Sequence, residues 1–290
     1  MNELKRAYYE MSYELRFIKL KGNEFQNFFA EIMGKRYPGD FMRVKPWGKQ
    51  GDQKNDGYLK SERTLFQVYA PNEMTEREMI KKVAEDFRGA LPHWEQYFDT
   101  WVFVHNARDG LGPEQTKILL ALDKENNDVH VTSWSFDMLR QKLFELDEND
   151  LLILLGPVPS RHDFVNIRAE QLKGVLGSLP KVSPPYDLEI RPVRGDKIKK
   201  NELSKSVCCL LKAGMEGASK VEWFFQNHPD KTLGDQIAQS FKAEYMKLRD
   251  ENLEPDKIFF RMHEFAGGSF RESPEHEASV LAVLAYFFEQ

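Results

Sequence analysis

Cysteine is scarce in this sequence. The 290 residues include two cysteines, Cys208 and Cys209, which are adjacent. Neighbouring cysteines rarely bridge each other, and two thiols cannot build a disulfide framework or a cysteine-rich zinc site. The composition therefore excludes a small domain that depends on disulfides or on cysteine-bound zinc.

Long apolar runs are also missing. The most apolar stretch, residues 151–158, is far shorter than the roughly 18 residues that a membrane helix needs. The N-terminus, MNELKRAYYE, is charged and lacks the apolar run of a secretory signal. We therefore expect a cytoplasmic protein without a membrane partner.

The sequence has no excess of positive charge. Its 41 Lys and Arg against 46 Asp and Glu give a net charge of -5, so any nucleic-acid binding needs a local basic patch. Hydrophobic residues make up 41% of the chain, which is enough for a sizeable core. The length fits one large domain or two ordinary ones.

A segment rich in proline and charge, residues 178–204, separates two different patterns. Proline is excluded from helix interiors and central strands, so this segment interrupts regular structure. Strands and helices alternate before it, and helices predominate after it. We place the domain boundary near residue 165, which gives domains over 1–165 and 166–290.

The first domain has the expected order helix, strand, strand, strand, helix, strand. A mixed sheet flanked by helices fits this order best, so the fold class is α/β followed by a mainly α-helical domain. The expected elements are a helix over 22–33, strands or extended segments over 41–47, 53–59 and 64–70, a helix over 76–98 interrupted near Pro92, strands over 100–105 and 129–134, and a helix over 136–145. Helices are expected after the boundary over 202–212, 218–228, 232–250, 255–264 and 274–288.

The richest stretch for chemistry is residues 45–71. Asp56 follows a glycine-rich turn, and the next strand carries Gln67 and Tyr69, which share one face because they are two residues apart. If this strand pairs with the segment of Asp56, the three side chains converge at one end of the sheet. With Glu24 at the neighbouring helix start, they could hold Mg²⁺, which takes oxygen ligands and can activate water against a phosphate.

A plainer interpretation of the same residues stays open. Asp-Gly is common in turns, so Asp56-Gly57 could be a hairpin turn, with Asp52 capping the preceding bend.

The charge around this stretch favours phosphate binding. A local positive patch with interleaved aromatic residues, Trp47 and Tyr58, suits a nucleic-acid backbone and a divalent ion. A solvated charged face is the alternative. The basic residues are Lys35, Arg36, Arg43, Lys45, Lys49 and Lys54, and the acids among them are Asp40 and Asp52.

Residues 14–145, in this order of elements, resemble the core of the PD-(D/E)XK nuclease superfamily. The segments GDQKNDGYL and FQVYAP are similar to the N-terminal domains of nuclease-like chains in bacterial ABC-three-component anti-phage systems, including Lamassu-like systems. The C-terminal segments KIKKNELS, VEWFFQNHP and IAQSFKAEYMKL resemble the helical domains that define these systems.

The resemblance implies a role for each matching residue. Asp56 corresponds to the metal-binding aspartate, Gln67 to the acidic or glutamine position, and Glu24 to the helix-borne glutamate, with Gln26 as a competing alignment. Tyr69 stands where the superfamily has a lysine that orients the attacking water. Its reference pKa of about 10 leaves it uncharged near neutral pH, so Lys54 or Lys45 would have to supply the charge.

The resemblance also implies partners and a cofactor. We expect a DNA endonuclease that uses Mg²⁺ or Mn²⁺ and works beside an SMC/Rad50-like ATPase and a small third component. The expected DNA contacts are Arg43, Lys45 and Lys49. Assembly, including homo-oligomers, could complete a site that one chain lacks. The alternatives are a catalytically inactive scaffold that binds DNA or protein, and a protein-interaction module without a nucleic-acid role.

Overall fold

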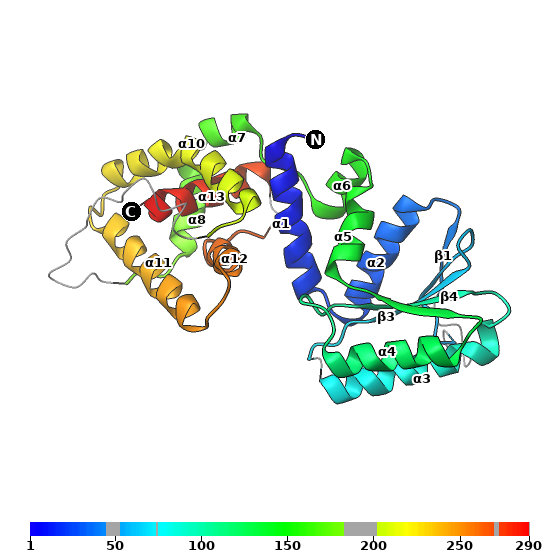
Figure 1. The fold of residues 1–290 in the computed structure, drawn as a ribbon. Helices are drawn as coiled ribbons and strands as arrows, with labels where there is room; N and C mark the ends of the chain where they lie inside the picture. Colours follow the sequence, from blue (N-terminus) through cyan, green and yellow to red (C-terminus); the bar gives the residue numbers. More distant parts are fainter. Residues whose placement is uncertain (45–52, 74, 183–201, 270–272, 290) are drawn as a thin grey trace. The chain divides into compact units, whose positions relative to one another are not determined.

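The computed structural model describes residues 1–44, 53–73, 75–182, 202–269 and 273–289 (Figure 1). The chain divides into two compact units. The sheet unit is Glu14–Leu154, and the helical unit combines Met1–Tyr13 with Leu155–Gln290. The boundary expected near residue 165 stays a prediction.

A five-stranded mixed sheet forms the centre of the sheet unit. Its strands are β1 (Phe41–Arg43), β2 (Gly57–Leu59), β3 (Thr64–Tyr69), β4 (Thr100–His105) and β5 (His130–Trp134). They lie side by side in chain order. Antiparallel pairing joins β1, β2 and β3, whereas β3, β4 and β5 are parallel. The sheet therefore changes from antiparallel to parallel at β3, the strand that carries Gln67 and Tyr69.

Helices cover both faces of this sheet (Figure 1). α3 (Glu76–Trp94) and α4 (Pro113–Glu125) lie on one face, where Leu65, Phe87 and Trp101 belong to a single buried cluster. α2 (Gly22–Arg36) and α5 (Phe136–Phe144) cover the other face. There Phe66 contacts Phe29 of α2 and Trp134 of β5, with ring centroids 5.4 and 5.1 Å apart.

The remaining helices are α1, α6 and those of the helical unit. Their bounds are α1 Glu3–Lys19, α6 Glu148–Leu155, α7 Arg161–Val165, α8 Ala169–Ser178, α10 Lys205–Asn227, α11 Leu233–Asp250, α12 Pro255–Phe265 and α13 Pro274–Glu289. None of the described helices combines the length and apolar character that a membrane crossing requires.

The predicted fold class is confirmed, because a mixed sheet flanked by helices precedes a mainly helical region. Several details were wrong. The helices expected over 202–212 and 218–228 are one continuous helix, α10. The helix α3 continues through Pro92, where an interruption was expected. The helices α1, α4, α6, α7 and α8 were not predicted. The strand expected over 41–47 is formed over Phe41–Arg43, and residues 45–47 lie outside the described ranges.

Close packing explains why α10 is not interrupted. Its glycines, Gly214 and Gly217, lower helix propensity by about 1 kcal/mol each relative to alanine. Both face α13. A Cβ on Gly217 would lie 2.8 Å from the Cβ of Ala282, and one on Gly214 would overlap the carbonyl of Leu281. The glycines let the two helices approach, and the resulting burial outweighs their poor propensity.

Candidate functional site

Asp56 lies directly before β2 and contacts β3. Its backbone N–H donates to the carbonyl of Phe66 at 2.9 Å, while Gly57 is the register partner of the same residue. Two successive residues thus lie opposite one, as in a β-bulge. The carboxylate Oδ2 of Asp56 accepts a hydrogen bond from the N–H of Val68 at 2.7 Å. The hairpin-turn interpretation is wrong, because Gly57 is a strand residue paired on both sides.

The contact with Val68 brings the Asp56 carboxylate to the segment between Gln67 and Tyr69. Gln67 is 5% exposed, and its Oε1 has no hydrogen-bond donor within the described ranges. An acceptor left in this state costs about 1–3 kcal/mol. A bound group that interacts with this amide oxygen would relieve that cost.

Tyr69 lies on the same sheet face as Gln67, toward α3. Burial, together with the carboxylates of Glu78 and Asp86, raises the pKa of Tyr69, so the phenol stays protonated near neutral pH. Tyr69 therefore offers a hydrogen-bond donor without a charge.

Two lysines bring positive charge to this face. The ammonium of Lys54 lies 2.9 Å from the fully buried carboxylate of Asp86 on α3, and the ammonium of Lys82 lies at the same distance. The Lys82 Nζ is also 6.0 Å from the centroid of the Tyr69 ring. Sequence reasoning missed Lys82 and Asp86, because their four-residue spacing resembles an ordinary surface pair on a helix.

Glu24 approaches from the other face of the sheet. It is exposed in the first turn of α2, which packs against Phe66 rather than on the side of Gln67. The start of α2 is attached to the end of β3, since the N–H of Gly22 donates to the carbonyl of Ala70 at 2.6 Å. Glu24 and the half-buried Gln26 are thus held near the end of β3. This placement does not decide which of the two corresponds to the helix-borne metal ligand.

The predicted basic patch lies partly outside the described ranges, which omit Lys45, Lys49 and Asp52. Arg43 is exposed at the end of β1, and its guanidinium donates to Asn27 of α2. Within the described ranges, no group of three or more His, Cys, Asp and Glu could hold a metal ion. Such groups do not include glutamine, so this finding does not test a site that uses the amide of Gln67. The proposed ligands therefore stay a prediction.

Comparison with known proteins gives a match in the C-terminal part of the chain. Residues 170–290 match the family model for C-terminal domain 10 of the ABC-three component systems. This match supports membership of an ABC-three component system. We refer to residues 170–290 as the CTD10-like domain. No curated protein and no solved structure matches the chain.

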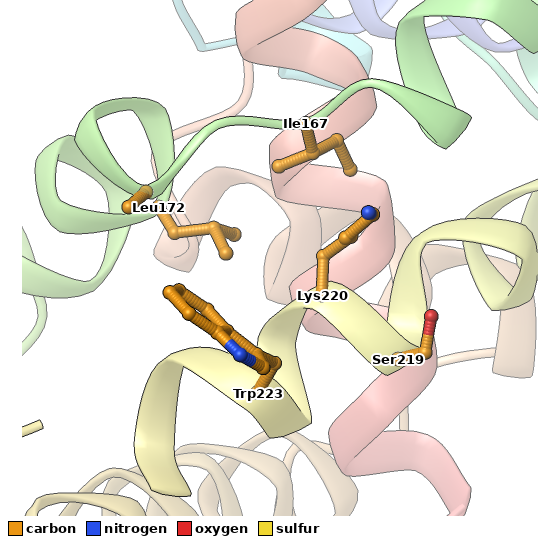
Figure 2. Close-up of a pocket in the computed structure, with 6 residues that line it drawn as sticks. Ile167, Leu172, Ser219, Lys220 and Trp223 are labelled. Atoms are coloured by element: carbon orange, nitrogen blue, oxygen red, sulfur yellow. The ribbon is translucent and has the colours of Figure 1, made fainter. Parts of the chain in front are cut away.

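The CTD10-like domain carries an exposed tryptophan beside a hollow of about 350 Å³. Trp223 on α10 is 56% exposed, and its indole faces Leu172 of α8 (Figure 2). Ile167 lies just before the domain and lines the same hollow, as do Lys220 and Ser219. A large aromatic side chain at the mouth of a partly apolar hollow is typical of a protein contact surface.

The match does not extend to the sheet unit. The nuclease-like assignment, the DNA substrate, the Mg²⁺ or Mn²⁺ cofactor and the Lamassu-like type therefore stay predictions, as does the ATPase partner.

Proposed function

We propose that this chain is a metal-dependent DNA endonuclease, the effector subunit of an ABC-three component defence complex. The observation that carries the proposal is the hydrogen bond of the Asp56 carboxylate, at 2.7 Å, with the backbone N–H of Val68, the residue between Gln67 and Tyr69 in β3. The buried Gln67 Oε1, without a donor in the described ranges, fits an oxygen-binding cation.

Each side chain of the site has a distinct role in this proposal. Asp56 and Gln67, with Glu24 from the neighbouring helix, would hold Mg²⁺ or Mn²⁺. The ion would supply an activated water and stabilise charge on the phosphate. Tyr69 donates a hydrogen bond to the phosphate or to the water. Lys54 supplies the positive charge that Tyr69 lacks, and it is held near this face by Asp86.

The remaining parts of the chain bind DNA and partners. Arg43, Lys45 and Lys49 contact the phosphate backbone of double-stranded DNA. The CTD10-like domain attaches the chain to an SMC/Rad50-like ATPase and to a small third component. Infection releases or assembles the active complex, and assembly, including pairing of identical chains, completes a site that one chain lacks.

Replacement of Asp56 by asparagine tests the cleavage proposal. Asp56→Asn keeps an acceptor for the Val68 N–H but removes the charge. We expect plasmid degradation by the assembled complex with Mg²⁺ to fall at least about 100-fold, because even outer-shell changes at metal sites cost 10–100-fold. The matched control is Asp128→Asn, an exposed aspartate between α4 and β5, which should cut as the wild type does. Equal cleavage by both variants would remove Asp56 from the site.

A second candidate function is a nuclease-like scaffold that binds DNA without cutting it. Tyr69 in place of the superfamily lysine favours this candidate, because the ammonium of Lys54 is already paired with Asp86. The scaffold predicts salt-sensitive DNA retention by the complex and no Mg²⁺-dependent cleavage. A pure protein-interaction module predicts no DNA retention even at low salt.

A further inference from the structure

A second hollow of about 320 Å³ lies within the sheet unit, at the carboxyl ends of β3 and β4. Pro71 and Asn72, which follow β3, form one wall, and residues 106–112, which follow β4, form another. Small ligands of open α/β sheets bind outside the carboxyl ends of parallel strands. The volume falls within the range of about 300–1,000 Å³ that is usual for ligand sites.

Two cations line this hollow. Lys21, directly before α2, makes no ion pair with a described residue, and burial lowers its pKa. Its ammonium is therefore partly desolvated, which strengthens its attraction for an anion. Arg108 is held in place by Glu14 at 3.2 Å and by the ring of Phe136, whose centroid is 3.7 Å from the guanidinium carbon.

The first turn of α4 adds backbone donors. Gly112 precedes the helix and provides no capping side chain, and Pro113 occupies the first turn. The next N–H groups therefore have no side-chain cap. Uncapped N–H groups at a helix start attract anions, and the helix dipole adds to the effect.

Asn106 is an independent indication of a ligand. It lines the hollow and is 7% exposed, yet its Nδ2 has no acceptor in the described ranges. Buried amide groups are almost always hydrogen-bonded, so this donor calls for an acceptor that it does not find among the described residues as they are placed. Asp109 is the one carboxylate among the lining residues, and it is exposed at the rim.

We propose that this hollow binds the phosphate group of a small phosphomonoester. The phosphate accepts from Asn106 and the first turn of α4 and is paired with Lys21 and Arg108. The apolar side chains of Pro71, Met79 and Leu111 form a wall for the organic part of the ligand. Asp56 and Gln67 are not among the residues that line this hollow, so the proposal does not depend on the proposed cleavage.

Titration calorimetry of the full chain with inorganic phosphate, adenosine 5′-monophosphate and adenosine tests the proposal. We expect phosphate and the monophosphate to bind and to compete, and adenosine not to bind. Lys21→Ala should weaken both at least about tenfold, since hydrogen bonds to charged groups are the strong ones. Lys21→Arg should retain binding, because it keeps the charge.

The control is Lys124→Ala, at the opposite end of α4, which should bind as the wild type does. Circular dichroism and thermal unfolding establish that each variant is folded. A short DNA strand with a 5′-phosphate identifies the source of the group, because a nucleic-acid end would displace phosphate better than the free nucleotide does. The proposal is overturned if neither phosphate nor the monophosphate binds, or if folded Lys21→Ala binds them normally.

Discussion

His105, the last residue of β4, is an imidazole that the fold keeps neutral. It is 1% exposed, and its Nδ1 accepts a hydrogen bond from the N–H of Ala107 at 3.3 Å. Burial lowers the pKa of His105 from 6.5 to about 4. Protonation would place a charge in an apolar site and remove the acceptor, so it opposes folding.

The stability of the sheet unit should therefore fall in mild acid. Between pH 6.5 and 4 the unfolded chain binds a proton at His105 and the folded chain does not, so the free energy of unfolding decreases as the pH falls. The contribution reaches about 3 kcal/mol at pH 4. Urea unfolding at several pH values should show a shallower slope for His105→Asn, which keeps an acceptor. The exposed His93→Gln should leave the slope unchanged, and equal slopes for all three proteins would contradict the prediction.

The positions of some candidate site residues could be predicted from the sequence, and those of others could not. Gln67 and Tyr69 could be placed on one face because alternation in a strand is regular. The contact of Asp56 with the Val68 N–H depends on two residues opposite Phe66, an irregularity that no periodicity predicts. Asn106 belongs to no recognisable motif, because what singles it out is a buried amide nitrogen without an acceptor among the described residues.

Among the helices, glycine has two opposite effects in this chain. Gly217 of α10 is packed against α13, and a Cβ there would lie 2.7 Å from Ile167 Cδ1. Gly174 of α8 has nothing within 4 Å of the corresponding position. The first glycine is required by packing, whereas the second only lowers helix propensity.

Alanine substitutions should therefore change stability in opposite directions. We expect Gly217→Ala to lower the free energy of unfolding by about 1–3 kcal/mol, because overpacking forces the helices apart. Gly174→Ala should raise it by up to about 1 kcal/mol through helix propensity. Chemical unfolding of the full chain measures both values. A stabilising effect at Gly217 would contradict the close approach of α10 and α13.

Glycine and proline also limit how well the sequence predicts whole helices and strands, because each can mark a loop, a helix start or a packing contact. The strand Thr100–His105 was predicted with its correct bounds, since β-branched and aromatic residues follow one another there. α4 was missed because Gly110, Gly112 and Pro113 suggest a loop, although proline in the first turn is a normal helix start. Local breakers cannot be distinguished from helix starts or packing contacts until the neighbouring elements are known.

For the whole molecule, the CTD10-like domain implies partner chains within a multi-component system. Exposed aromatic residues beside a hollow often dominate the energy of protein contacts. Trp223 fits that description better than the other exposed apolar residues of the described helical unit, because a hollow of about 350 Å³ adjoins it.

Trp223→Ala should therefore weaken assembly with the partner chains. We expect the dissociation constant to rise at least about 30-fold, since a dominant interface residue contributes 2 kcal/mol or more. Met246→Ala, at an exposed position of α11 in the same domain, is the control and should assemble normally. Co-purification and sedimentation of the co-expressed chains measure the effect. Normal assembly of both variants would place the interface elsewhere.

The N-terminal segment Met1–Tyr13 is translated first, but it packs in the helical unit, most of which is translated last. Ser12 Oγ donates to the carbonyl of Leu155 at 3.1 Å, and Ser206 Oγ donates to the Glu10 carboxylate at 2.6 Å. The contact partners of the first thirteen residues are therefore translated more than a hundred residues after them. Glu14–Leu154 is a continuous stretch and can fold before those partners are made. A fragment that starts at Leu155 would lack these contacts, so its solubility would not represent the intact chain.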